Sequence, residues 1–324
     1  MIPVRILGTA AALPGRAIPT AEVAARCLPG KDPEEIIRRT GIRTRHWAEP
    51  GALMSELAAR ALGEATARAG LDVRDLRRVI LVSSTGGDII GPATANAVIH
   101  ALGIDGRCDG LDVINACMGF VTAFDLAARC VATGKSPIGI VAVEMMSRFI
   151  RPEDPRPYLV MADAAAAAVL GPGRPGEGVL ASFAANDGGN GRTVFADHPA
   201  LTRKMEPVQF AVPNQEMGRI VIDAIRKSAS AVLDEHGARI EDIDWVLPHQ
   251  PNGSMLDTMV ETLGVDRARV VPIVSEVGSI VSASLPVSLD RLLRTREVKP
   301  GARILMIGVG SGLAYGALLY RVAL

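Results

Sequence analysis

Short apolar runs typical of buried strands alternate along this chain with longer segments of helical periodicity. The runs Val79 to Ser83, Leu111 to Asn115 and Ile138 to Val143 are of the first kind. Ser55 to Gly70 and Glu216 to His236 carry apolar residues at helical spacing. A strand that is apolar on both faces has to be covered on both sides, and helices normally provide that cover. The alternation therefore predicts an α/β fold built from layers of sheet and helix.

Two pairs of strand-like segments suggest an internal duplication. The run Ile138 to Val143 is followed, after a gap, by the small-residue run Ala164 to Gly171. Near the end of the chain, Arg303 to Gly310 is followed in the same way by Ala314 to Val322. We expect each pair to form a central strand and its antiparallel neighbour. A chance similarity between common apolar strands would give the same pattern.

The boundary between the two halves is predicted from glycine and proline. These residues are concentrated between Gly171 and Gly178, where they interrupt regular structure. We therefore predict an N-terminal half of residues 1–173 and a C-terminal half of residues 174–324. Residues 186–213 are rich in glycine, proline and polar residues, which predicts a long surface excursion.

Composition and charge exclude several classes of protein. Lys and Arg together number 35, as do Asp and Glu, so nothing indicates a nucleic-acid partner. The apolar run Ala164 to Leu170 is far shorter than a membrane span, and Arg5 interrupts the apolar N-terminus. The four cysteines form neither a CxxC pair nor a zinc-like cluster with histidine. We expect a cytoplasmic protein without disulfides, a metal site or a resident cofactor.

Cys117 occupies a position suited to a nucleophile. The predicted strand Leu111 to Asn115 ends just before it, and a predicted helix, Met118 to Thr133, begins just after it. Free N–H groups at a helix N-terminus can bind an oxyanion, and the helix dipole is expected to lower the thiol pKa. The alternative is a small buried side chain, which is what most free cysteines are. Cys27, Cys108 and Cys130 lack this context, and we interpret them as structural.

His249 follows a second predicted strand, Trp245 to Leu247, after Pro248. A histidine at such a strand end can act as a proton donor or as a base within reach of a thiolate. The alternative is an ordinary hydrogen-bonded loop histidine. Asn252 is a candidate amide donor to a ligand, and its alternative role is to cap the following helix.

A glycine-rich turn, Gly308 to Gly316, joins the last two predicted strands. It does not match the dinucleotide-binding fingerprint, because Leu313 stands where the third glycine belongs and a strand follows instead of a helix. Glycines between two strands permit close approach of a ligand or of another backbone. The alternative is a tight turn that requires positive φ.

These segments, in this order, resemble the β-ketoacyl-acyl-carrier-protein synthase III family of the thiolase-like superfamily. The resemblance spans nearly the whole chain. It is carried by RTGIRTRHW (Arg39 to Trp47), NACMGF (Asn115 to Phe120), VLPHQPN (Val246 to Asn252), VGSIVSAS (Val277 to Ser284) and the glycine-rich turn.

The resemblance implies a thiolase-like fold, in which duplicated βαβαβ halves form a five-layered α-β-α-β-α core, usually in a homodimer. It also implies a ping-pong reaction with acyl-CoA or acyl carrier protein. Cys117 would take the acyl group, and a malonyl thioester would then lose CO₂ and attack the acyl-enzyme. The N–H of Cys117 and one from the Gly310–Ser311 turn would form the oxyanion hole. His249 would donate a hydrogen bond to the malonyl thioester carbonyl.

One departure from the family concerns the reaction. The family loop resembles HGNTSAAS, and its asparagine joins the histidine at the enolate. Here the aligned residues read VGSIVSAS, so that Ser279 replaces the asparagine. Serine has a shorter reach, which weakens the case for decarboxylation. The alternatives are a non-condensing acyltransferase that uses His249 as general base towards a hydroxyl or amine, and a non-catalytic subunit of the same fold.

Two further departures concern the substrates. The family often stacks adenine between a tryptophan and an arginine, and here Glu35 replaces the tryptophan while Arg148 matches the arginine. Arg39 and Arg148 are candidate phosphate contacts, or else ordinary surface ion pairs. Gly91 stands where the family often has a bulky residue that closes the acyl pocket, so a larger or branched acyl group is expected unless Gly91 only serves a flexible turn.

Overall fold

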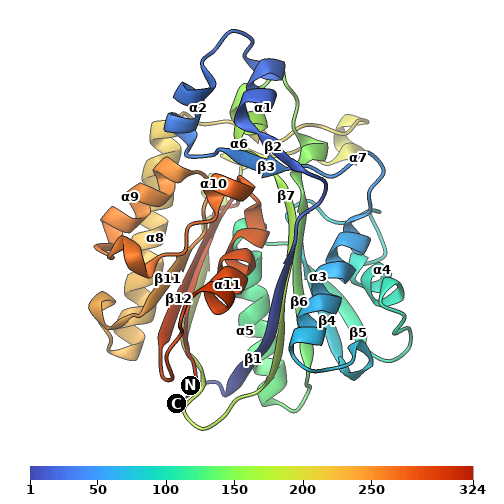
Figure 1. Ribbon diagram of the computed structural model, residues 1–324, viewed down its shortest axis with the longest axis vertical. Coiled ribbons are helices and arrows are strands. Elements are labelled where there is room, and N and C mark those ends of the chain that lie inside the picture. Colours follow the sequence, from blue (N-terminus) through green and yellow to red (C-terminus); the bar gives the residue numbers. More distant parts are fainter. Residues whose placement is uncertain (324) are drawn as a thin grey trace.

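In the computed structural model, which describes residues 1–323, two sheets lie on either side of a central pair of helices, and further helices cover both outer faces (Figure 1). The first sheet has the strand order β1-β7-β6-β4-β5. Strands β4, β5 and β6 are parallel, β7 is antiparallel to β6, and β1 is antiparallel to β7. Its strands are β1 (Val4–Ala12), β4 (Arg78–Val82), β5 (Asp109–Val113), β6 (Ile138–Met145) and β7 (Asp163–Pro172).

The second sheet repeats the arrangement of the first. Its order is β11-β12-β13-β8, with β11 parallel to β12 and the other neighbours antiparallel. A parallel bridge from Val246 to Val270 occupies the place that β5 has in the first sheet. The predicted duplication is thus confirmed. The strands are β8 (Gly178–Asn186), β11 (Trp245–Pro248), β12 (Arg303–Gly310) and β13 (Ala314–Arg321).

The two strand pairs that suggested the duplication are antiparallel neighbours, as predicted. Strand β6 pairs with β7, and β12 pairs with β13. The first half ends its sheet at Pro172 and the second begins its own at Gly178. The exact division of the chain between residues 173 and 174 stays a prediction.

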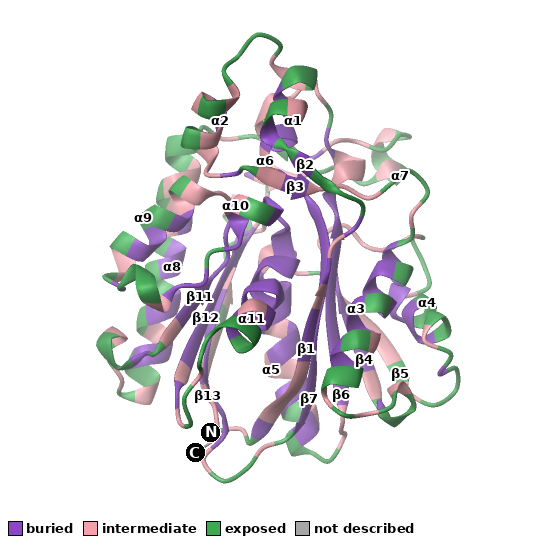
Figure 2. Ribbon diagram, viewed as in Figure 1, coloured by how far each residue is buried: buried purple, intermediate pink, exposed green. Residues whose placement is uncertain are grey.

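Helices supply the three remaining layers of the α-β-α-β-α core, and burial follows these layers (Figure 2). Helices α5 and α11 lie between the sheets, α3 and α4 cover the first sheet, and α8 and α9 cover the second. None of the helices within residues 1–323 has both the length and the apolar character needed to cross a membrane. The layer helices are α3 (Met54–Arg68), α4 (Thr94–Ala101), α5 (Gly119–Ala132), α8 (Asn214–His236), α9 (Gly253–Leu263) and α11 (Ser284–Thr295).

The alanine run of β7 explains how helices fit closely on both faces of one strand. Ala164, Ala166 and Ala168 belong to the cluster between the sheets, whereas Ala165 and Ala167 belong to the outer cluster that contains α3. Successive side chains of a strand point to opposite faces. Alanine on both faces therefore lets α5 and α3 pack against the same strand.

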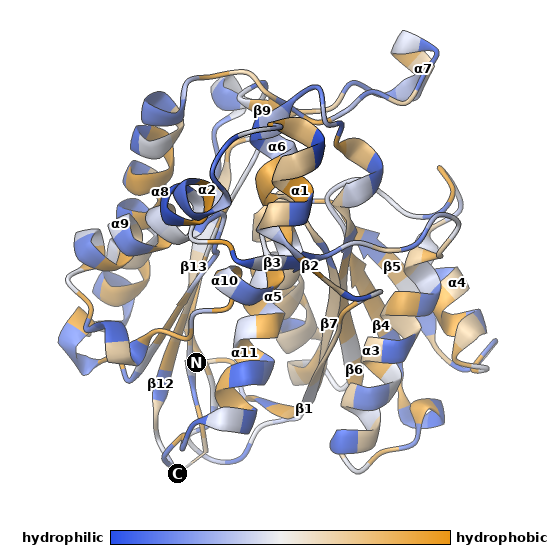
Figure 3. Ribbon diagram, turned by 45° about the horizontal axis from the view of Figure 1, so that its top comes forward, coloured by the Kyte–Doolittle hydropathy of each residue, from blue (hydrophilic) through white to orange (hydrophobic). Residues whose placement is uncertain are grey.

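Smaller elements form a cap over one end of the sheets (Figure 3). A buried apolar cluster joins this cap to Met146, which follows β6, and to Val281, and Cys117 packs against the cluster. The cap therefore covers the end of the molecule where the predicted site residues lie. The remaining elements are α1 (Thr20–Cys27), α2 (Pro33–Thr40), α6 (Pro155–Val160), α7 (Pro199–Thr202), α10 (Val274–Val277), β2 (Ala17–Pro19), β3 (Thr44–His46), β9 (Val194–Phe195) and β10 (Gln209–Phe210).

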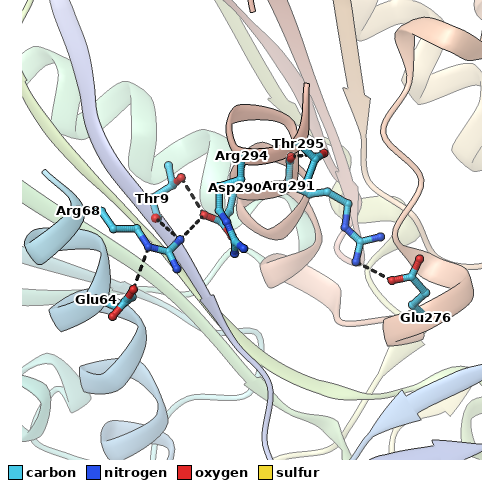
Figure 4. Close-up of polar contacts among 8 residues, drawn as sticks. All are labelled: Thr9, Glu64, Arg68, Glu276, Asp290, Arg291, Arg294 and Thr295. Atoms are coloured by element: carbon cyan, nitrogen blue, oxygen red, sulfur yellow. Dashed lines mark hydrogen bonds and ion pairs between the residues drawn. The ribbon is translucent and has the colours of Figure 1, made fainter. Parts of the chain in front are cut away.

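A buried carboxylate fixes α11 to the first sheet and its outer helix (Figure 4). Asp290 accepts hydrogen bonds from Thr9 Oγ1 at 3.0 Å and from Arg68 Nη1 at 3.1 Å, and Arg294 lies 3.4 Å away. Asp290 is only 3% exposed, and a buried charge is tolerated when it is paired in this way. Because α11 starts directly after the VGSIVSAS segment, this anchor also holds one end of that segment.

Candidate active site

Cys117 lies at the junction that the sequence predicts. It follows β5 and sits in a short 3₁₀ turn, η2 (Ala116–Met118), immediately before α5. Ala116 has φ of 44°, a left-handed conformation that is uncommon for a residue with a Cβ. Asn115 supports the turn, because its Nδ2 donates to Thr122 Oγ1 at 2.9 Å. The half-buried Cys117 is thus presented on a sharp strand-to-helix turn.

The protonation state of Cys117 differs from the prediction. Burial raises the pKa of the thiol well above its usual range, and the carboxylate of Glu144 raises it further, against the opposing effect of the Cys117 backbone. The lowered pKa predicted from the helix N-terminus is therefore wrong. Burial disfavours the thiolate, and Cys117 is a thiol at neutral pH, so nucleophilic attack must be coupled to proton loss.

The glycine-rich strand lies directly against the Cys117 turn. A Cβ added to Gly310 would lie 2.7 Å from the backbone nitrogen of Cys117 and 3.2 Å from that of Met118. A Cβ on Gly308 would lie 2.8 Å from Met118 Sδ. The absence of side chains at these positions lets β12 lie directly against the Cys117 turn. Ser311 follows at once in the turn, and Gly312 has φ of 125°, so the turn also needs glycine for its conformation.

His249 reaches the same place from the neighbouring strand. It follows β11 directly, and its N–H donates to the carbonyl of Ile307 on β12 at 2.8 Å. The residue is 3% exposed, burial lowers its pKa to about 4, and its Nδ1 is buried without a hydrogen-bond partner among the described residues. His249 is thus a neutral imidazole, one strand away from the glycines that contact the Cys117 turn.

Gln250 was not singled out in the sequence, yet it anchors the histidine. Its Nε2 donates to the carbonyl of Val271 at 2.9 Å, and its Oε1 accepts from the N–H of Ile273 at 2.9 Å. Its own N–H donates to Ser284 Oγ at 3.1 Å. The only sequence signal was a polar residue directly after the candidate histidine. These bonds fix the backbone that carries His249.

Asn252 serves as a helix cap. Its Oδ1 accepts from the N–H of Met255 at 2.9 Å at the start of α9. The next residue, Gly253, is in close contact with Gly41 at the end of α2, where a Cβ on Gly253 would lie 2.6 Å from the Gly41 Cα. The RTGIR and histidine segments are therefore packed together through two glycines. A role for Asn252 as a ligand donor stays a prediction.

Ser279 is buried beneath the cap. Its N–H donates to the carbonyl of Val160 at 2.8 Å, and its carbonyl accepts from the N–H of Ala162 at 3.0 Å. Val281 has φ of 48°, which is unfavourable for a β-branched residue. The structure thus holds Ser279 through its backbone, in a segment with a strained turn.

Glu144 is a second buried group that the sequence analysis missed. It is fully buried on β6, and burial raises its pKa to about 7. Its carboxylate accepts hydrogen bonds from Ser84 Oγ at 2.7 Å and from Ser282 Oγ. In the sequence Glu144 ends an apolar strand, which is the one signal that set it apart.

The two predicted phosphate contacts are both paired with carboxylates. Arg39 is 77% exposed and forms an i,i+4 ion pair with Glu35. Arg148 lies 3.4 Å from Asp88 and also donates to the carbonyl of Ala52. Both arginines therefore form the ion pairs that the sequence analysis gave as the alternative. A contact of either arginine with phosphate stays a prediction.

Gly91 is not part of a closed pocket within one chain. It is exposed, and a Cβ placed on it would meet no atom within 4 Å. The neighbouring side chains Ile89 and Ile90 are also exposed. The predicted effect of Gly91 on the size of the acyl group is therefore not supported by contacts inside this chain.

Comparison with known proteins assigns the family. Residues 111–188 match the family described as 3-oxoacyl-[acyl-carrier-protein] synthase III, and residues 233–322 match its C-terminal family. The β-ketoacyl-[acyl-carrier-protein] synthase III of Rhizorhabdus wittichii is 34% identical over 319 residues, with 98% of each chain covered. The chain belongs to the β-ketoacyl-[acyl-carrier-protein] synthase III family. Members of this family are acyltransferases, and this chain is an acyltransferase of the same class.

Other relatives show how the synthase III family varies. A 3-oxopimeloyl-[acyl-carrier-protein] synthase of Rhodothermus marinus is 30% identical and covers 98% of this chain and 93% of its own. Synthase III (FabH) of Pseudomonas aeruginosa superposes with a TM-score of 0.91 at 28% identity, over 99% of both chains. The priming β-ketosynthase of the R1128 polyketide pathway gives 0.90 at 28% identity, over 99% of this chain and 96% of its own. The thiolase-like fold expected from the sequence is confirmed.

Proposed function

We propose that Cys117 accepts an acyl group from an acyl thioester and that the acyl-enzyme then condenses with a malonyl thioester. The observation that carries this proposal is the contact of the glycine strand with the Cys117 turn. Gly310 lies against the Cys117 turn without a side chain, and His249 directly follows the strand that adjoins β12. We infer that the nucleophile, a main-chain donor and the imidazole act at one place.

The proposed reaction has two stages. In the first, the Cys117 sulfur attacks the thioester carbonyl as its proton leaves, the oxyanion accepts hydrogen bonds from the N–H groups of Cys117 and Ser311, and the donor thiol departs. In the second, the malonyl group loses CO₂, its carbanion forms a carbon–carbon bond with the acyl carbon, and the Cys117 thiolate departs and is reprotonated. His249 donates to the malonyl thioester carbonyl and stabilises the enolate.

The protonation state of His249 bears on the choice between condensation and transfer of the acyl group to an alcohol or amine. With its pKa lowered to about 4, His249 is a weak base towards an alcohol or amine but retains a ring N–H to donate. This observation favours condensation. Ser279 favours the second candidate, a non-condensing acyltransferase, because its hydroxyl replaces the family's asparagine amide. We favour condensation, because the His249 imidazole would act directly on the carbonyl of the malonyl thioester.

The acylated enzyme is expected to release CO₂ from malonyl-carrier protein. The substitution Ser279→Asn is expected to increase the rate of this release, because an amide reaches further than a hydroxyl. Release of radiolabelled CO₂ after pre-acylation measures the rate in the wild type and in the variant. Transfer of the acyl group to an alcohol or amine without any CO₂ would establish the second candidate instead. An unchanged rate in Ser279→Asn would show that this position does not contact the malonyl group.

The ion pairs of Arg39 and Arg148 favour a carrier-protein thioester over acyl-CoA as the donor. Each guanidinium already pairs with a carboxylate, Glu35 or Asp88, which offsets part of its attraction for the phosphates of coenzyme A. We expect a higher kcat/KM with acyl carrier protein than with acyl-CoA.

The substitution Glu35→Gln is expected to lower the KM for acyl-CoA, because it releases Arg39. The control Asp223→Asn, in an i,i+4 pair on α8, should leave this KM unchanged. A lower KM for acyl-CoA than for the carrier protein in the wild type contradicts this preference.

A homodimer and a cytoplasmic location complete the proposal. Strand β5 forms the edge of the first sheet, and Ile114, directly after it, is 66% exposed. An exposed edge strand beside large apolar side chains is normally covered. A second copy of the chain is the partner that we propose for this edge.

A further inference from the structure

A buried carboxylate connects three segments around the nucleophile. Glu144 stands near the end of β6, and its Oε1 accepts from the N–H of Ser84 at 3.0 Å and from its hydroxyl at 2.7 Å, just beyond β4. On the other side the same oxygen accepts from the hydroxyl of Ser282 and, at 3.4 Å, from its N–H. Glu144 therefore joins the first sheet to the short turn η7 (Val281–Ala283).

The turn that Glu144 holds is strained and lies beside the nucleophile. Val281 is in the left-handed region, which a β-branched residue adopts only when its surroundings enforce it. A Cβ on Gly119, at the start of α5, would lie 4.0 Å from the Ser282 Cβ. The hydroxyl of Ser282 is thus a restraint on a strained segment that packs against the helix following Cys117.

The same segment connects the two groups proposed to act on the second substrate. Ser279 precedes the turn, and Ser284 follows it and accepts from the N–H of Gln250, the residue after His249. A bond at Ser282 can therefore set the position of Ser279 and of the backbone beside His249.

We propose that Glu144 is a positioning residue that holds the 277–284 segment against the Cys117 turn through the hydroxyl of Ser282. This inference rests on the proposed function, because it assigns the segment to the transfer stage. Removing the Ser282 hydroxyl is expected to impair transfer from the acyl-enzyme while leaving acylation of Cys117 nearly intact.

The negative charge of Glu144 also affects the Cys117 thiol, and this effect can be tested separately from the hydrogen bond to Ser282. Burial is the main cause of the raised pKa of Cys117, and the carboxylate of Glu144 raises it further. Near the Glu144 end of β6, the charged groups include Asp163 on β7, which accepts from Ser147 and Ala48, and Arg148. Glu144→Gln removes the charge, and therefore we expect alkylation of Cys117 by iodoacetamide to reach half its limiting rate at a lower pH. Ser282→Ala keeps the charge and should leave this midpoint unchanged.

The test measures the two stages separately in the full-length protein. For Ser282→Ala we expect CO₂ release from the pre-acylated enzyme to fall about tenfold, as for loss of a hydrogen bond to a charged group. Single-turnover acylation, followed by intact mass, should stay within about twofold, and Ser282→Thr should restore transfer. Ser228→Ala removes a buried hydroxyl that bonds only within α8, and it is the matched control.

Three outcomes would overturn the inference: Ser282→Ala matches the control in both stages, both stages fall equally, or Glu144→Gln leaves the alkylation midpoint in place. Failure of the proposed function is distinguishable, because the wild type would then release no CO₂ at all. The alkylation profile does not depend on that reaction and still reports whether Glu144 controls the thiol.

Discussion

Replacement of His249 by alanine is expected to trap the enzyme in its acylated form and to lower overall turnover by about 10²–10⁴-fold. His249 is placed to donate to the second substrate, whereas the first stage depends on Cys117 and on main-chain N–H groups. The variant should therefore still react with the acyl donor. Mass spectrometry of the intact protein during turnover measures the accumulated acyl-enzyme.

The control for this variant is His100→Ala. His100 is an exposed histidine on α4 that pairs with Asp105 at 3.0 Å, away from the residues described at the site. Its activity should equal that of the wild type. Loss of acylation in His249→Ala, with a normal melting temperature, would mean that His249 acts in the first stage, as the base for Cys117.

Replacement of Gly310 by alanine is expected to reduce acylation by about 10²–10³-fold, the effect of losing one oxyanion-hole donor. The new methyl group would lie 2.7 Å from the Cys117 nitrogen, so it would displace the N–H that we propose as an oxyanion donor. The measurement is the single-turnover rate of acylation, together with the melting temperature. A lower melting temperature is also expected, because the contact is closer than side chains tolerate.

Gly188→Ala is the matched control for Gly310→Ala. A Cβ at Gly188 meets no atom within 4 Å, so both the acylation rate and the melting temperature should stay unchanged. If Gly310→Ala acylates at the wild-type rate, the glycine turn does not border the oxyanion, and the donor pair proposed here is incorrect.

Local patterns in the sequence predict most of the fold. The apolar run Val79 to Ser83 is β4, and the segment Glu216 to His236 lies within α8. The alanine run from Ala164 is β7, whose two buried faces follow from the period of a strand. The position of Cys117 between strand and helix was also predictable, because both neighbours carry strong periodic signals.

Features that depend on distant pairs could not be predicted in this way. Glu144 meets Ser282 across 138 positions of the chain, and Arg148 meets Asp88 across 60. No local pattern indicates which polar residues a fold brings together. The protonation of Cys117 has the same origin, because the burial and the carboxylate that raise its pKa are set by tertiary packing.

The most direct test of the proposed function is to locate the acyl group after reaction with an acyl-carrier-protein or acyl-CoA thioester. We predict a mass increase equal to one acyl group on the peptide that contains Cys117, and none on the peptides of Cys27, Cys108 or Cys130. Absence of any adduct, or an adduct on another cysteine that persists in Cys117→Ala, would contradict the assignment of Cys117 as the acyl carrier.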